Sequence, residues 1–111
     1  CINQNRYLNL AGKTNLEELI EIFRQCDLLI SLDSGSTHLA TAAGAKRIVS
    51  IYCATPKSYY APIGENYKGL TTELSCQPCH KRKCKLKGEN HNACTKVPKV
   101  DEVLEVINNL L

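Results

Sequence analysis

The hydrophobic pattern of the first half of the chain predicts two helices and two strands. Apolar residues recur on one face over residues 15–25, which is typical of an amphipathic helix. Residues 27–32 are almost continuously apolar, which favours a strand covered on both faces of a parallel sheet. A small-residue helix over 37–43, ended by Gly44, and a strand over 47–52 follow. Strand, helix and strand in this order predict a βαβ unit.

The first helix is predicted to begin at Thr14. Thr14 and Glu17 have the spacing of a capping box, and Glu17 and Glu18 favour the positive end of the helix dipole. Gly12-Lys13-Thr14 resembles the end of a phosphate-binding Walker loop, but that pattern needs a glycine where this chain has Tyr7. We therefore interpret Thr14 as a helix cap.

Beyond Tyr52 the pattern is irregular and basic. Prolines and glycines interrupt the segment, and residues 57–99 contain nine basic and three acidic residues. A final helix is expected with Pro98 in its first turn. Its apolar stripe would consist of Val100, Val103, Leu104, Ile107 and Leu111.

The composition indicates one small folded domain, and the predicted βαβ unit places it in the α/β class. The chain has 111 residues and a net charge of +3, with 43% hydrophobic and 23% charged residues, which excludes a disordered or collagen-like chain. No apolar run is long enough to cross a bilayer, and the first residues do not have the pattern expected of a signal peptide. Because methionine is absent and the chain opens on Cys1, we expect residues 1–111 to be part of a longer protein.

Residues 33–38 are the strongest candidate for a binding site. They lie between a predicted strand and a predicted helix, where open α/β sheets bind ligands. Backbone N–H groups at the helix start can bind phosphate, Gly35 allows close approach, and His38 could donate a hydrogen bond to a diphosphate oxygen. Asp33 would repel phosphate, so it is expected to cap the helix or to accept from sugar hydroxyls. Further donors are the hydroxyls of Ser34, Ser36 and Thr37. A capped helix with a surface histidine is the alternative.

A cysteine-rich loop spans residues 76–94. In a reducing cytoplasm such a cluster predicts tetrahedral zinc, because thiolates bind Zn²⁺ and the ion organises a loop that has no core of its own. Two disulfides or simply reduced thiols are the alternatives, since the spacing is not that of a standard zinc finger. Cys1, Cys26 and Cys53 stand apart and are expected to be packing or exposed thiols. The candidate ligands are Cys76, Cys79, Cys84 and Cys94, with His80 and His91 as substitutes.

The basic run over residues 81–87 could attract nucleic acid or anionic lipid. It contains no aromatic residue for base stacking and no recognition helix, so a nucleic-acid partner is not expected. A solvated face or a peripheral contact with the bacterial inner membrane is the preferred interpretation.

Two stretches, residues 9–19 (NLAGKTNLEEL) and 26–40 (CDLLISLDSGSTHLA), resemble the carboxyl-terminal half of glycosyltransferase family 9, the lipopolysaccharide heptosyltransferases. The resemblance continues through Tyr59–Gly64, the cysteine-rich loop and the final helix, and so covers nearly the whole chain. It implies a Rossmann-like parallel sheet that is part of the C-terminal domain of a GT-B enzyme. In such enzymes this domain binds the nucleotide sugar, here ADP-heptose.

The resemblance also implies roles for individual residues. Asp33, Ser34, Gly35 and His38 match the nucleotide-sugar motif, with Thr37 in the same site, and Thr14 matches a contact on the adenine side. The catalytic base and the site for the lipid A core acceptor would belong to an N-terminal domain outside this chain. The chain would therefore contain no catalytic residue, need no cofactor for transfer, and work in the cytoplasm. Where relatives carry Gly-Pro-Thr after the second strand, this chain has Cys53-Ala54-Thr55.

Two other functions compete with this interpretation. In a zinc-organised binding module, the four clustered cysteines would define the function and the βαβ unit would be the scaffold. In a non-catalytic nucleotide-sensing domain, the chain would bind ADP without belonging to a transferase. Metal content and ADP binding distinguish these functions.

Overall fold

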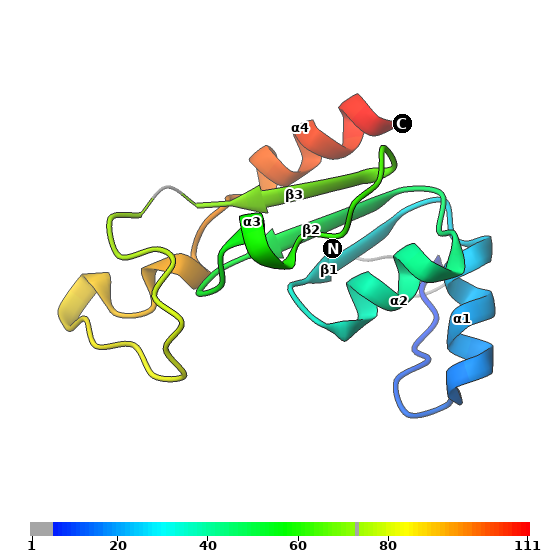
Figure 1. The fold of residues 1–111 in the computed structure, drawn as a ribbon, viewed down its shortest axis with the longest axis horizontal. Coiled ribbons are helices and arrows are strands. Elements are labelled where there is room, and N and C mark those ends of the chain that lie inside the picture. Colours follow the sequence, from blue (N-terminus) through cyan, green and yellow to red (C-terminus); the bar gives the residue numbers. More distant parts are fainter. Residues whose placement is uncertain (1–5, 73) are drawn as a thin grey trace.

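The centre of the fold is a parallel sheet of three strands, seen in a computed structural model that describes residues 6–72 and 74–111 (Figure 1). The strands are β1 (Leu29–Leu32), β2 (Ile48–Tyr52) and β3 (Tyr67–Thr71), in the spatial order β1-β2-β3. Ile48 is the register partner of Leu29 on one side and of Tyr67 on the other. The predicted α/β class with a Rossmann-like parallel sheet is confirmed.

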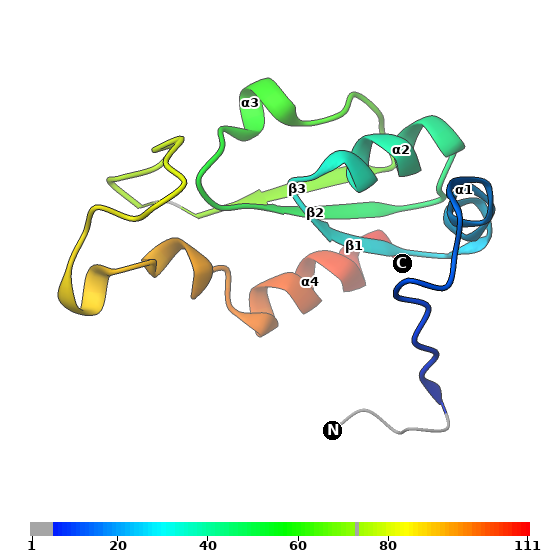
Figure 2. The same cartoon turned by 90° about the horizontal axis from the view of Figure 1, so that it is seen from below.

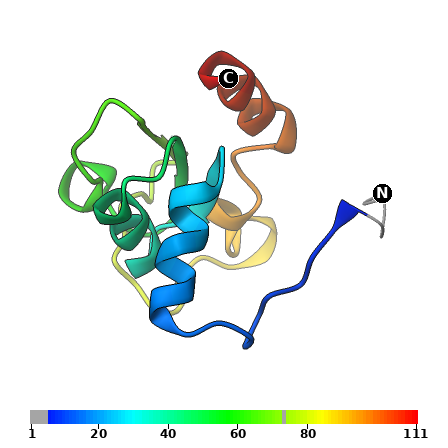
Figure 3. The ribbon, with the colours of Figure 1, turned by 90° about the vertical axis from the view of Figure 1, so that its right-hand side faces the viewer.

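Helices cover both faces of this sheet. Helices α2 (Gly35–Ala43) and α3 (Lys57–Tyr60) lie on one face, and α4 (Val100–Leu110) lies on the other (Figure 2). Helix α1 (Leu16–Gln25) packs beside α2 (Figure 3). Two short 3-10 turns, Gly88–Asn90 and Ala93–Thr95, lie in the cysteine-rich loop.

The main core lies between α1, α2 and the start of β2. Phe23 of α1, Ala40 of α2 and Ile48 of β2 are buried there, together with Ala45. Gly44 ends α2 in the left-handed conformation at φ 80°, which glycine adopts without steric cost. The predicted helix with its glycine stop is therefore confirmed, although it begins at Gly35 rather than Thr37.

The cap of α1 differs from the prediction by one residue. The side chain of Asn15, and not that of Thr14, accepts from the Glu18 backbone N–H at 2.9 Å. The Glu18 carboxylate in turn accepts from the Asn15 N–H at 2.8 Å. Asn15 and Glu18 have the same spacing as Thr14 and Glu17, and asparagine is at least as good a cap as threonine. The predicted Thr14 capping box was wrong, and Thr14 stays outside the helix.

The prediction that the first strand is covered on both faces was also wrong. Leu29 and Ser31 are half-buried, but Ile30 and Leu32 on the opposite face are 51% and 64% exposed. β1 lies at an edge of the described sheet, and α2 packs against it on one face, whereas α4, which lies on the other face of the sheet, makes little contact with it. The prediction suits β2 instead, because the side chains of Ile48, Val49 and Tyr52 are fully buried.

The end of the chain also departs in detail from its predicted pattern. Helix α4 begins at Val100, so Pro98 precedes it, and the Glu102 carboxylate accepts from the Lys99 N–H at 3.1 Å. Of the predicted apolar stripe Ile107 is buried, whereas Val100 and Leu104 are exposed. Strand β3 and helix α3 were not predicted, because the stretch that forms them contains several prolines, glycines and lysines.

Two tyrosines, the buried Tyr52 and the half-buried Tyr67, join β2 to β3 and to the end of α3. The Tyr67 hydroxyl donates to the Tyr52 hydroxyl at 2.7 Å, and the Tyr52 hydroxyl donates to the Tyr60 carbonyl at 3.3 Å. Burial raises the pKa of Tyr67, and its hydrogen bond to Tyr52 raises this pKa further. Burial also raises the pKa of Tyr52, although the bond from Tyr67 opposes this shift.

Replacing Tyr67 by phenylalanine removes the first of these bonds. We predict that Tyr67→Phe lowers the free energy of unfolding at neutral pH by about 1 kcal/mol, measured by urea unfolding. An unfolded tyrosine ionises near pH 10, and the folded one only at higher pH. Above about pH 10 the folded chain therefore keeps a proton on Tyr67 that the unfolded chain loses. As a result, the contribution of Tyr67 to the free energy of unfolding decreases as the pH rises above about 10. The difference between wild type and variant should therefore shrink at about pH 10.5. A difference independent of pH would contradict the prediction.

Candidate functional site

The candidate site lies at the edge of the sheet where β1 and β2 end. Because the strands are parallel, the segments that follow them meet there. The Asp33 N–H donates to the Ile51 carbonyl at 3.1 Å, which continues the pairing one residue past β1. The Thr55 hydroxyl donates to the Asp33 carboxylate. The segments after the two strands are thus tied together through Asp33.

Serine hydroxyls gather at the start of α2. Ser34 and Ser36 are hydrogen-bonded at 2.6 Å, and Ser31 of β1 lies 3.2 Å from Ser36. Ser34 occupies the cap position, but its side chain makes no hydrogen bond to the helix backbone. The Thr37 N–H donates to the Ser34 carbonyl at 3.1 Å, whereas the N–H groups of Gly35 and Ser36 remain available for a ligand. The first turn also carries no acidic residue, so its partial positive charge is not offset from within the helix.

Thr37 faces the interior of the fold. It is 1% exposed, and its hydroxyl donates to the Leu32 carbonyl at 3.1 Å and is hydrogen-bonded to the Ser50 hydroxyl at 2.9 Å. The hydroxyl is therefore engaged with β1 and β2 and does not point to the surface, where a ligand would bind. Thr37 positions the start of α2 on the sheet.

His38 follows Thr37 and, unlike it, has an exposed side chain. It lies on the same helical turn as Gly35, whose backbone is also exposed. A Cβ atom built onto Gly35 would have no neighbouring atom within 4 Å outside the adjacent residues and the helix backbone. There is therefore open space beside this residue. The structure therefore brings together four of the predicted site residues, namely Asp33, Ser34, Gly35 and His38.

Thr14 is not part of this group. It lies before α1 and lines a separate hollow of about 380 Å³, together with Leu10, Lys13 and Glu18. None of residues 33–38 lines that hollow. The predicted contact of Thr14 with an adenine stays a prediction.

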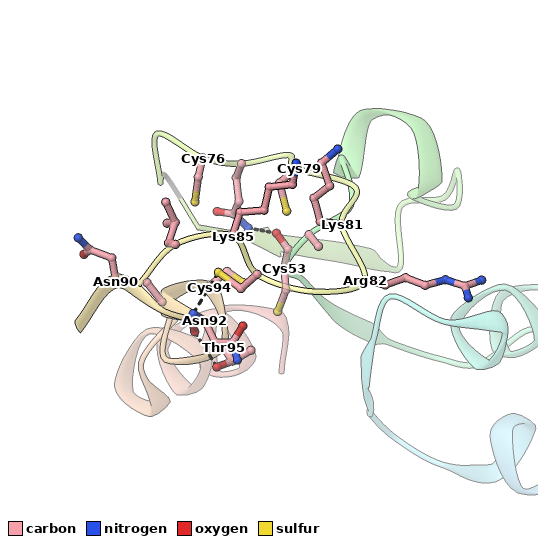
Figure 4. A pocket seen from close by; sticks show the side chains of 15 residues that line it. Cys53, Cys76, Cys79, Lys81, Arg82, Lys85, Asn90, Asn92, Cys94 and Thr95 are labelled. Carbon is pink, nitrogen blue, oxygen red and sulfur yellow. Dashed lines mark hydrogen bonds between the residues drawn. The ribbon is translucent and has the colours of Figure 1, made fainter. Parts of the chain in front are cut away.

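The cysteine-rich loop surrounds a pocket of about 330 Å³ at the same end of the sheet (Figure 4). Its lining includes Cys76, Cys79, Cys84 and Cys94, as the predicted cluster implied, and also Cys53, which follows β2. Among the described residues, no three histidine, cysteine or acidic side chains lie close enough together to hold one metal ion. The zinc prediction therefore stays a prediction.

The three other cysteines have different surroundings. Burial raises the pKa of the Cys53 thiol, and the proximity of Cys94 adds to the shift. The Cys26 thiol is half-buried and donates to the Phe23 carbonyl at 3.3 Å, as expected of a packing thiol. Cys1 lies outside the described residues.

Some residues of the site could be found only in the structure. Sequence reasoning missed Ser31, Thr55 and Cys53 as members of these clusters. Their signal was present, since Thr55 and Cys53 directly follow the second predicted strand and parallel strands end at one edge. Within residues 6–72 and 74–111, no helix is both long enough and apolar enough to cross a membrane.

Comparison with known proteins identifies similar proteins of one family. A family model described as glycosyltransferase family 9 (heptosyltransferase) matches residues 2–89. The chain is 36% identical over 93% of its length to lipooligosaccharide heptosyltransferase 2 of Campylobacter jejuni serotype O:2. It is 38% identical over half of its length to the lipopolysaccharide core heptosyltransferase OpsX of Haemophilus influenzae. The chain spans 31% of the Campylobacter protein and 14% of the Haemophilus protein. No solved structure gives a significant match.

The buried pair Thr37 and Ser50 allows a test of how α2 is positioned. We predict that Thr37→Val lowers the free energy of unfolding by about 1–2 kcal/mol, because it leaves buried polar groups with fewer partners. Ser50→Ala should cost a similar amount, and the double variant should lose about 1 kcal/mol less than the sum, measured by urea unfolding.

Thr41→Val is the matched control on the same helix. Its hydroxyl bonds only the Thr37 carbonyl one turn back, at 2.9 Å, so its loss should change stability by about 0.5 kcal/mol or less. Strictly additive effects of the Thr37 and Ser50 substitutions would show that the hydrogen bond does not couple the helix to the sheet.

Proposed function

Because the chain belongs to glycosyltransferase family 9, the heptosyltransferases, we propose that it is the donor-binding part of a glycosyltransferase of lipopolysaccharide core synthesis. The single observation that supports this most is the uncapped start of α2, with His38 exposed beside it, at the carboxyl edge of a parallel sheet. That edge is where open α/β sheets bind nucleotides.

In this proposal the N–H groups of Gly35 and Ser36 bind the diphosphate of a nucleotide sugar. A helix N-terminus suits phosphate, because free N–H groups and the helix dipole both favour negative charge. His38 donates a hydrogen bond to a phosphate oxygen from the exposed side of the same turn. Charge grows on the leaving diphosphate as the glycosidic bond breaks, so these donors stabilise the transition state more than the bound donor.

Asp33 has a different role in this proposal. Its carboxylate is held by Thr55, next to the phosphate-binding turn but outside it. Since a carboxylate repels phosphate, Asp33 accepts hydrogen bonds from hydroxyl groups of the ribose or the sugar. Thr55 fixes the orientation of this carboxylate. Thr55 matches the threonine of Gly-Pro-Thr, so this role belongs to the part of the pattern that the chain keeps, whereas Cys53 and Ala54 replace the glycine and the proline.

The remaining parts of the reaction are proposed from the relatives. Their names refer to heptosyl transfer in lipooligosaccharide and lipopolysaccharide core synthesis. We extend this to ADP-heptose as the donor, a lipopolysaccharide core saccharide as the acceptor, and a GT-B architecture for the longer protein. The acceptor site and the catalytic base then belong to the part of such relatives that this chain does not span. The reaction would take place at the cytoplasmic side of the inner membrane.

Calorimetric titration of the chain with nucleotides tests the diphosphate site. We predict that ADP binds and that AMP, which lacks the β-phosphate, binds about tenfold or more weakly, since a hydrogen bond to a charged group contributes about 1.5–3 kcal/mol. His38→Ala should weaken ADP binding about tenfold and should reduce the difference between ADP and AMP.

His91→Ala is the matched control, because His91 is also an exposed histidine but lies in the cysteine-rich loop. It should leave ADP affinity unchanged. Equal affinities for ADP and AMP, or an equal loss in the two histidine variants, would contradict the assignment of the diphosphate to the start of α2.

A further inference from the structure

The cysteine-rich loop has no hydrophobic core of its own. Every described residue from 74 to 99 is half-buried or exposed, and the loop contains only two short 3-10 turns. Such a segment gains too little from burial to offset the entropy lost when it is ordered. A single conformation of the loop therefore needs some other source of stability.

Hydrogen bonds hold the base of the loop but not its tip. The His80 N–H donates to the Ala54 carbonyl at 2.9 Å, and the Gln77 side-chain amide donates to the Cys53 carbonyl. Both bonds join the loop to the segment that follows β2. From Lys81 to Lys96, the hydrogen bonds in the described structure are local to the loop.

The loop thiols surround one pocket. Cys76 and Cys79 point into it from one side, and Cys94 points toward it from the opposite side (Figure 4). The lining also includes Cys84, and all these thiols are free. Residues up to 18 positions apart in sequence thus direct sulfur atoms into one space of about 330 Å³.

Three basic residues, Lys81, Arg82 and Lys85, line the pocket. Lys85 extends across it, whereas the Arg82 side chain extends away from it (Figure 4). Their positive charge would partly balance the net negative charge of four thiolates around a divalent ion. The Asn92 backbone N–H also donates to the Cys84 sulfur at 3.4 Å. Outer hydrogen bonds of this kind hold metal ligands in orientation.

We propose that Cys76, Cys79, Cys84 and Cys94 bind one zinc ion, which cross-links the loop. Four thiolates form the closed tetrahedral set typical of structural zinc. The sulfurs of the described structure surround the pocket without converging, so zinc binding draws the tip of the loop inward. Each thiol loses its proton to solvent as its sulfur bonds the ion, and no electron is transferred.

The site has a consequence for the edge of the sheet. The loop is bonded to Cys53 and Ala54, and the next residue, Thr55, holds the Asp33 carboxylate. Zinc would therefore stiffen the segment that borders the proposed donor site. The zinc site itself does not depend on the proposed function, since it rests only on the loop.

Metal analysis of the chain tests the proposal. The chain is produced with zinc in the medium, purified under reducing conditions, and measured by inductively coupled plasma mass spectrometry. We expect about one zinc per chain, and tetrahedral cobalt–thiolate absorption bands when cobalt replaces zinc. Cys79→Ser should lose the stoichiometric metal. Two control variants, Cys53→Ser and Cys26→Ser, should keep the metal. Cys53 lines the pocket but is not a proposed ligand, and Cys26 lies far from the loop.

X-ray absorption at the zinc edge of the wild-type chain supplies a test that needs no variant. Four sulfur neighbours at about 2.3 Å support the proposal, whereas nitrogen or oxygen neighbours overturn the ligand set. Loss of metal in Cys53→Ser overturns it as well. A metal-free chain overturns the zinc site itself, whether its thiols are all free or mass spectrometry shows disulfides. A chain that contains iron and inorganic sulfide also overturns the zinc site.

Discussion

The hydrogen bond between the buried hydroxyls of Thr37 and Ser50 fixes where α2 begins relative to the sheet, and the candidate site depends on this position. Ser50 lies in the middle of β2, which pairs with both neighbouring strands. Thr37 also bonds the last carbonyl of β1, so one side chain joins the helix to two strands. With Thr37 turned inward, the next residue, His38, faces outward. The N–H groups of Gly35 and Ser36 and the histidine are thereby presented together at one edge of the sheet.

A second link at this edge joins the segments that follow β1 and β2. The bond from Thr55 to Asp33 connects the start of the proposed phosphate site to a stretch that also carries the base of the cysteine-rich loop. A donor site and a thiol-lined pocket are therefore neighbours along the segment 53–55, although the loop is remote from α2 in sequence. Order in the loop would support the carboxylate that we assign to sugar hydroxyls.

The parts of the fold that the sequence predicted correctly are those decided by local chemistry. Gly44 ends α2 because glycine adopts the left-handed conformation there, and the apolar run that follows α1 becomes β1 as expected. Local chemistry was not sufficient where two adjacent residues could each cap the same helix. Thr14 and Asn15 both have a glutamate three residues later, and only the geometry of the turn selects Asn15.

Long-range contacts were the least predictable part of the site. Thr37 has a hydroxyl that suits a phosphate, but Ser50, thirteen residues away, takes it into the interior. Cys53 stands apart from the other cysteines in sequence, and only the pairing of the loop with the end of β2 places it beside them. The coverage of β1 depends on what packs on its outer face, which the pattern of that strand does not contain.

The central claim is that the start of α2 binds the diphosphate of an adenine nucleotide. The most direct measurement is a ¹⁵N–¹H NMR titration of the chain with ADP, run beside UDP, which maps the binding site onto single backbone amides. The account predicts that ADP shifts the amides of residues 33–39 selectively and that the exposed tip of the cysteine-rich loop does not respond. A well-dispersed spectrum whose shifts avoid residues 33–39 would contradict it.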